Sequence, residues 1–421
     1  MKKVILLILL ALSFNTYAQS LSNHYRIDVA VKPSEGYLKV NCKLDFIADK
    51  PTTDIVYWLN SAFQPIEVTS EDVDSIWFTN GEGFLSHVAE VHIRFKDEIK
   101  EGGETKIHFT YEGTIQADQF IDRGNITPAW TELSVGAMWY PVSLEESWLT
   151  YDITLTAPSQ YEVISAGEVI QQEETKWRIH EELVTPGRII VMLSDQLHRT
   201  RTSVTPYTVD FYVLEPDDPL VDSLQQYTQQ LLTFFDERFG AVESKTNHMK
   251  IFFPNRDIEG VSNGGFSANG KFIMLNNGRN ADAQYDVLSH EIAHFWWRHG
   301  TLGTYHDFLN EGLAEFSKLL ARNEKYGDKN MQSLTNYYRE QTKELGSIKS
   351  WDIQNLQERH LYLYWKGSLV MADLLNEAGE EKVYAILKRT SSEKISRYEE
   401  FLQIVEEVAG SKIAEEFDQK F

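Results

Sequence analysis

Cysteine is nearly absent from this chain of 421 residues, in which Cys42 is the only one. A single cysteine excludes a disulfide within the chain, and it also excludes a structural zinc site built from several cysteines. The stability of the fold must therefore come from buried apolar side chains. The length is sufficient for two or three domains with substantial cores.

Positive charge is also scarce. Lys and Arg number 40 against 63 Asp and Glu, which gives a formal net charge of −23. Phosphate groups repel a surface this acidic, so we expect neither a nucleic-acid partner nor binding to an anionic membrane surface. Nothing in the sequence indicates the oligomeric state.

Apolar runs long enough to span a bilayer are missing from the sequence. At the start of the chain, Lys2 and Lys3 precede the short apolar run 4–12, and Thr16 and Ala18 provide small residues at a cleavage site. This pattern is typical of a secretory signal peptide spanning residues 1–18. We expect export, to the periplasm or outside the cell, without stable membrane insertion after cleavage. An uncleaved N-terminal anchor is the alternative.

The remaining chain divides by pattern into two domains, 19–205 and 206–421. In the first, short runs of alternating apolar and polar residues, such as 25–31 and 151–155, predict antiparallel β-strands. In the second, strands at 209–214, 250–253 and 271–275 are mixed with helical patterns that continue to Phe421. The fold class is therefore α+β, with an N-terminal antiparallel β domain and a mixed second domain.

The first helix of the second domain has recognisable ends. Asp222 and Gln225 resemble a capping box at its start, and Gly240 is suited to its end.

The segment 290–294 reads His-Glu-Ile-Ala-His, and its apolar neighbours predict a helix that ends near Gly300. Two histidines four residues apart share one helix face, so both imidazoles can bind one metal ion. Glu291 between them is then placed as a general base. Two unrelated histidines on a helix remain the alternative at this point.

A second segment supports the metal-site interpretation. In Asn310-Glu311-Gly312, Glu311 can supply the third ligand of a zinc site that keeps one position open for water. Glu315 lies one turn further along and can accept a hydrogen bond from a ligand histidine; the alternative is a solvated helix carboxylate. The extended motif with a third histidine is excluded, because Trp297 replaces its glycine and His299 comes one residue early.

Together, HEIAH, NEGLAE and the later Tyr364-Trp365-Lys366-Gly367 resemble the motifs of the aminopeptidase N family of gluzincin metallopeptidases. The resemblance implies an N-terminal β domain followed by a thermolysin-like catalytic domain. It also implies a single Zn²⁺ per chain and a peptide substrate. By the same resemblance, Tyr364 is the hydrogen-bond donor to the reacting carbonyl oxygen, with Tyr362 as the second choice. Asn310 and Glu315 then lie in the shell around the ligands His290, His294 and Glu311.

The sequence departs from the family in three places. The spacer between His294 and Glu311 is sixteen residues long, two shorter than in the family, and a loop can absorb that difference. The long C-terminal helical domain has no room, so the cleft is expected to be more open or covered by a partner. The GAMEN motif, whose glutamate grips the free amino group of the substrate, is replaced by Asn-Gly-Gly-Phe-Ser-Ala-Asn-Gly at 263–270.

This replacement segment contains no carboxylate. We expect Gly264, Gly265 and Phe266 to form an edge strand that aligns the substrate, with a plain glycine loop as the alternative. Asp257 and Glu259 are the candidates for holding the amine.

Three interpretations remain open. The leading one is an exported, aminopeptidase-like zinc metallopeptidase. A relative that cuts internally, or a zinc hydrolase of esters or epoxides, would use the same ligands. A non-catalytic β-rich binding protein with a degenerate peptidase domain is the third, although it has no chemical need for the base Glu291.

Overall fold

The computed structural model describes residues 22–421 apart from 64, 82–85, 116–123, 144–145, 147, 243–246, 259–260, 262–264, 269, 302, 352–354 and 356–357. The described residues form two compact units. The first runs to Leu197 and includes the described part of 257–262, and the second comprises His198–Arg256 and the chain from 263 onward. The predicted signal peptide, 1–18, lies outside the described residues.

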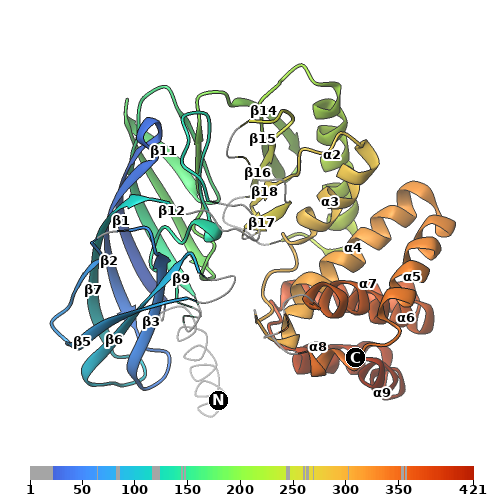
Figure 1. The fold of residues 1–421 in the computed structure, drawn as a ribbon. Helices are drawn as coiled ribbons and strands as arrows, with labels where there is room; N and C mark the ends of the chain where they lie inside the picture. The colour runs from blue at the N-terminus through green and yellow to red at the C-terminus, as the bar shows by residue number, and fades with distance from the viewer. Residues whose placement is uncertain are drawn as a thin grey trace, which may run out of the picture. The chain divides into compact units, whose positions relative to one another are not determined.

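The first unit is built from β-strands (Figure 1). They are β1 Asn23–Lys32, β2 Tyr37–Ile47, β3 Thr52–Asn60, β4 Glu67–Thr69, β5 Val73–Asn80, β6 Val88–Ile99, β7 Glu104–Thr114, β8 Thr131–Leu133, β9 Leu149–Thr156, β10 Glu162–Ser165, β11 Glu168–Glu173, β12 Lys176–Val184 and β13 Val191–Ser194.

Within the described residues, these strands make a seven-stranded sheet of order β11-β12-β9-β1-β2-β7-β4 and two three-stranded sheets, β10-β13-β8 and β3-β6-β5. Alternation places one face of β1 in the core, with Tyr25, Ile27, Val29 and Val31 buried. The β1–β9 pair is parallel, and the other strand pairs described in this unit are antiparallel.

The second unit combines a sheet with helices. Its elements are β14 His198–Val204, β15 Tyr207–Val213, α2 Pro219–Phe239, β16 His248–Phe253, β17 Phe266–Ala268, β18 Phe272–Met274, α3 Ala281–Ala293, α4 Phe308–Tyr326, α5 Asp328–Thr342, a π-helix His360–Lys366, α6 Gly367–Ala378, α7 Glu380–Ser392, α8 Tyr398–Ala409 and α9 Ser411–Lys420. The α+β class predicted from the sequence is confirmed. The sequence suggested a boundary between 205 and 206, whereas the structure divides the chain after Leu197. Strand β14 lies between these two positions, and it belongs to the second unit because it pairs with β15.

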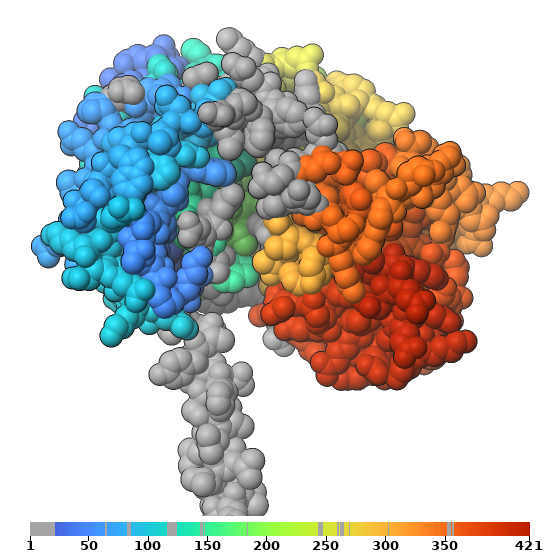
Figure 2. Space-filling model, turned by 60° about the horizontal axis from the view of Figure 1, so that its bottom comes forward, coloured from blue at the N-terminus to red at the C-terminus, as the bar shows by residue number. Residues whose placement is uncertain are grey.

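The sheet of the second unit has the order β14-β15-β16-β18-β17 in the described residues, with β15, β16 and β18 parallel and both edge strands antiparallel. Helices α2 and α3 lie beside this sheet (Figure 1). The later helices, coloured orange to red, form a continuous mass in the same unit (Figure 2). A single apolar core joins the sheet, α2, α3, α4 and the C-terminal helices.

Helix α2 is capped by Asp218, four residues before the predicted cap Asp222. Pro219 takes its first position, where a missing N–H costs nothing, and the Asp218 side chain accepts a hydrogen bond from the Leu220 N–H at 3.0 Å. Asp222, expected as the cap, lies within the first turn.

Candidate metal centre

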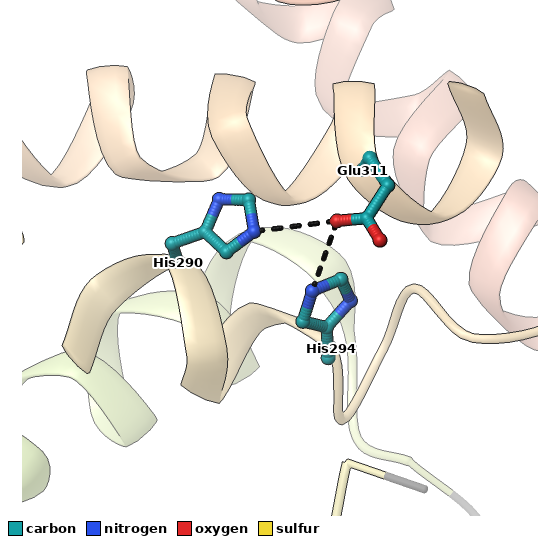
Figure 3. A group of neighbouring side chains, drawn as sticks. All are labelled: His290, His294 and Glu311. Carbon is teal, nitrogen blue, oxygen red and sulfur yellow. Dashed lines mark ion pairs between the residues drawn. The ribbon is translucent and has the colours of Figure 1, made fainter. Parts of the chain in front are cut away.

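Helix α3 carries the two histidines of the first motif. Its first turn is closed by Asn280, whose side chain accepts a hydrogen bond from the Ala283 N–H at 2.9 Å. The helix ends at Ala293, and His294 is its C-cap. In Figure 3 both imidazoles project from this element toward Glu311 on the neighbouring helix α4.

The expected continuation of α3 to Gly300 is wrong. Two tryptophans after His294 hold the chain in a turn instead. The Trp296 indole donates to the Gly240 carbonyl at 2.7 Å, and the Trp297 indole donates to the Ser317 hydroxyl at 2.8 Å. Both rings are buried, so these bonds replace contacts with water and fix the direction of the loop.

Three ligand-type atoms converge between α3 and α4. Glu311 Oε2 lies 3.5 Å from His290 Nε2 and 3.4 Å from His294 Nε2 (Figure 3). The ligand atoms of these three residues all lie within 4.8 Å of one another, and the described residues contain no other such group of His, Cys, Asp or Glu. The shortened spacer has therefore not separated Glu311 from the histidines.

The other nitrogen of each imidazole is already engaged. His290 Nδ1 lies 2.9 Å from Glu315 Oε2, and His294 Nδ1 lies 3.0 Å from the Trp297 carbonyl oxygen. A carboxylate and a carbonyl can only accept, so each Nδ1 carries the proton. The Nε2 atoms are then the ones that can present lone pairs to a metal ion.

The hydrogen bonds of the Glu311 carboxylate show whether a metal ion fits between the three residues. Its Oε1 accepts a hydrogen bond from Arg359 at 2.9 Å, whereas its buried Oε2 has no hydrogen-bond partner. A buried carboxylate oxygen without a donor is costly, and a cation between it and two Nε2 atoms removes that cost. Two histidines and one glutamate are a donor set that suits zinc with an open fourth position, so the residues fit zinc.

The charges around His290 are coupled to metal binding. Burial alone would lower the pKa of His290, but Glu311 and Glu315 together raise it to about 10. The two carboxylates therefore favour positive charge at the position where His290 and Glu311 meet.

Glu315 lies under His290 and is almost fully buried. Besides the bond from His290, its Oε1 accepts from the Tyr338 hydroxyl and from the Lys318 ammonium. Burial would raise the pKa of Glu315, but Lys318 and His290 hold it below its ordinary value. Glu315 is therefore an anion that fixes the orientation of a candidate ligand.

Glu291, the candidate base, is 9% exposed and lies close to the edge strand β17. A Cβ atom placed on Gly265, just before β17, would lie 3.9 Å from Glu291 Oε1 and only 2.9 Å from Val287 Cγ1. Because of this close approach, glycine suits that position. Phe266, the next predicted substrate-binding residue, begins β17 and is partly buried, and Gly264 lies outside the described residues.

Glu259 and Asp257 are the two residues expected to hold a substrate amine. Glu259 lies outside the described residues, and Asp257 belongs to the first unit.

Of the two tyrosines considered, Tyr364 lies against the candidate ligands. Its ring stacks on His290 with the centroids 5.4 Å apart and the planes 4° from parallel. Burial raises the pKa of its hydroxyl well above 10, and the negative charge of Glu311 raises it further. Tyr362 is instead part of the apolar core of the second unit.

Two motif glycines explain why Tyr364 comes so close. A Cβ on Gly312 would lie 2.9 Å from the Leu363 carbonyl oxygen, and one on Gly367 would lie 3.2 Å from Gly312 Cα. The start of α4 and the π-helix His360–Lys366 therefore approach each other across two residues without side chains. This contact brings the π-helix that carries Tyr364 against the turn that carries Glu311.

Asn310, on α4, forms hydrogen bonds with the loop that follows α3. Its side chain donates to the Gly300 carbonyl at 2.9 Å and accepts from the Gly300 N–H at 2.8 Å. It also donates to Asp307 at 2.9 Å, and the other oxygen of Asp307 accepts from Arg359 at 2.6 Å. Asn310 is therefore connected to Glu311 by hydrogen bonds through Asp307 and Arg359.

The sequence interpretation missed four contributors to this centre. Lys318 lies three residues after Glu315 on α4, and that spacing could have indicated it. The Trp297 carbonyl, Tyr338 and Arg359 follow no sequence pattern that we recognise.

Comparisons with known proteins identify solved structures that share the fold of this chain. No protein-family model and no curated protein sequence matches the chain. Among solved structures, an M1 zinc metallopeptidase from Deinococcus radiodurans is similar, with a TM-score of 0.67 and 13% identity, over 95% of this chain and 94% of that one. A mutant of an M1 zinc metallopeptidase from the same organism, bound to a Tyr-Ser-Ala substrate, gives 0.66 and 14% with the same coverage. A two-domain M1 zinc metallopeptidase mutant bound to L-tryptophan gives 0.64 and 14%, again with that coverage. The chain thus has the fold of two-domain M1 zinc metallopeptidases.

Proposed function

We propose that this protein is an exported zinc metallopeptidase that hydrolyses peptide bonds in an aminopeptidase-like manner. One observation carries the proposal: His290 Nε2, His294 Nε2 and Glu311 Oε2 converge, while the second atoms of all three groups are held by other partners. A site with this donor set and fixed tautomers is prepared for one Zn²⁺ with an open position.

When bound, zinc lowers the pKa of a coordinated water to about 7 and thereby supplies a nucleophile at neutral pH. Glu291 accepts the proton of the attacking water and later passes it to the leaving amine. Tyr364 accepts a hydrogen bond from Arg359 at 3.0 Å, so the hydrogen of its own hydroxyl is left for another acceptor. Donation of that hydrogen stabilises the charge that develops on the substrate carbonyl oxygen.

Peptides are the proposed substrates. The structural relatives have been seen with a Tyr-Ser-Ala substrate, with L-tryptophan and with L-arginine, which supports short peptides and their products as ligands of this chain too. The net charge of −23 argues against nucleic acid as a partner. No helix in the described part of the chain is long and apolar enough to cross a membrane.

A preference for a free amino terminus requires a group that binds the amine, and 263–270 contain no carboxylate for this role. Hydrolysis of one peptide in free and N-acetylated form tests it, with Glu291→Gln and bound zinc measured on the same samples. Cleavage of the free form alone by wild type, with an inactive variant that retains zinc, supports the proposal. Cleavage of both forms indicates a peptidase that cuts internally. Absence of zinc, or equal activity in the variant, contradicts catalysis and favours a binding protein.

Export rests on residues 1–18. The mass of the protein recovered from its own cells tests it: removal of a segment ending at Ala18 supports export, and an intact chain in the cytoplasm contradicts it.

A further inference from the structure

Arg359 is the one cation that binds both Glu311 and Tyr364 among the described contacts. Its Nη2 donates to Glu311 Oε1 at 2.9 Å and to Asp307 Oδ2 at 2.6 Å. Its Nη1 donates to the Tyr364 hydroxyl oxygen at 3.0 Å. The guanidinium therefore connects α4, which carries the third candidate ligand, with the π-helix that carries the candidate oxyanion donor.

The contact with Glu311 decides which oxygen faces the histidines. Because Oε1 is held by Arg359, Oε2 is the oxygen that lies 3.5 and 3.4 Å from the two Nε2 atoms. A carboxylate held in this way offers a metal one oxygen rather than two. The guanidinium also repels a bound cation, so it lowers the affinity of the site for zinc rather than raising it.

The contact with Tyr364 excludes the direction of the guanidinium for its hydroxyl hydrogen. A phenol oxygen that accepts from Arg359 has its own hydrogen directed elsewhere. The ring stack on His290 fixes the plane of the same side chain. Lysine cannot reproduce the arrangement, because a compact ammonium lacks the planar fork that spans three oxygen atoms in fixed directions.

We propose that Arg359 is a positioning residue, which restricts Glu311 to one ligand oxygen and holds the Tyr364 hydroxyl toward the substrate carbonyl. This proposal rests on the peptidase function proposed above. According to this proposal, Arg359 raises kcat and weakens the binding of zinc.

The buried carboxylate of Asp307 affects how the variant Arg359→Met is interpreted. Its side chain is 1% exposed, and burial raises its pKa while Arg359 lowers it. Removal of Arg359 alone leaves this carboxylate buried without its cation, which destabilises the fold. The pair of variants Arg359→Met and Asp307→Asn/Arg359→Met separates the two effects, because the second removes the uncompensated charge as well.

The experiment measures the zinc dissociation constant by competition with a chromogenic chelator, and kcat and KM for an unblocked peptide. The variants are Arg359→Met, Arg359→Lys and the double variant. Arg339→Met is the matched control, since Arg339 pairs with Asp373 on the surface and its side chain is 47% exposed. We expect zinc binding at least as tight as in wild type for Arg359→Met and the double variant. We expect kcat to fall about 100-fold with KM within about threefold, without rescue by lysine.

Two results would overturn the proposal. A role limited to neutralising Asp307 predicts that kcat and zinc binding fall in Arg359→Met and return to near the wild-type values in the double variant. A role in neither stability nor positioning predicts that kcat stays within about twofold of wild type. Failure of the peptidase proposal itself is distinct, because the wild-type protein would then bind no zinc or hydrolyse no peptide.

Discussion

Glu315→Gln is the substitution that most directly probes how the centre is oriented. The wild-type carboxylate accepts from His290 Nδ1 at 2.9 Å with one oxygen and from Tyr338 and Lys318 with the other. Glutamine has nearly the same shape but one acceptor oxygen and no charge. If that oxygen faces His290, the amide nitrogen faces the Lys318 ammonium, which cannot accept a hydrogen bond.

The magnitude follows from what His290 loses. The hydrogen bond from His290 Nδ1 is kept in the variant. The negative charge of Glu315, which makes Nε2 a stronger ligand for a metal ion, is lost. Loss of such an outer partner lowers metal affinity about 10- to 100-fold, which corresponds to about 1.4–2.7 kcal/mol. The assay is zinc competition with a chromogenic chelator at pH 7. Thermal unfolding of the metal-free proteins is measured in parallel, so that a general loss of stability is seen separately.

Glu324→Gln is the matched control, because Glu324 lies on the same helix and its side chain is 62% exposed, where it pairs with Arg238. We expect wild-type zinc affinity for this control. Equal zinc affinity in Glu315→Gln and Glu324→Gln would refute the idea that Glu315 tunes the candidate ligand.

Three further predictions concern stability and geometry. Burial raises the pKa of Glu146 in the first unit to about 7 from its ordinary 4.5, so the folded state holds the proton more tightly and stability falls by about 3 kcal/mol as pH rises from 4.5 to 7. Denaturant unfolding against pH should lose this fall in Glu146→Gln, and an unchanged pH profile would contradict the assignment. The Lys325 ammonium lies 3.7 Å from the ring centre of Tyr227 and 3.9 Å from that of Tyr285, so Lys325→Met should lower the free energy of unfolding by about 1–3 kcal/mol; equal denaturation midpoints would argue against it. Gly312→Ala should separate α4 from the π-helix and lower kcat about tenfold or more, measured against bound zinc, and an unaltered kcat would show that the close approach is not needed.

Local sequence patterns were sufficient to predict those parts of the fold that depend on residues close together in the chain. The spacing of His290, His294 and Glu311 on two helices predicted three side chains that the structure brings within 4.8 Å. The alternation in residues 25–31 predicted β1 with its buried face. The spacing of His290 and His294 and the strand alternation arise within a few residues of chain, where helix and strand periods apply directly. Glu311 lies further along the chain and was predicted from its motif instead.

The end of α3 and the role of Arg359 could not be predicted in this way. The helix stops at Ala293 because the indoles of Trp296 and Trp297 reach partners 56 and 20 residues away. Arg359 meets Glu311 across 48 residues of sequence. The parallel pairing of β1 with β9, in which Tyr25 lies opposite Tyr151, is equally long-range. Such contacts depend on the packing of whole elements, which no periodic signal in one segment records.

The most direct test of the proposed function is a zinc titration of the metal-free protein, followed by hydrolysis of an unblocked peptide. The site predicts that activity rises with added zinc and saturates at one ion per chain, and that Glu291→Gln binds the same single ion without restoring hydrolysis. Binding of no zinc, or equal hydrolysis by Glu291→Gln, would contradict the proposal that His290, His294 and Glu311 form a catalytic metal centre served by Glu291.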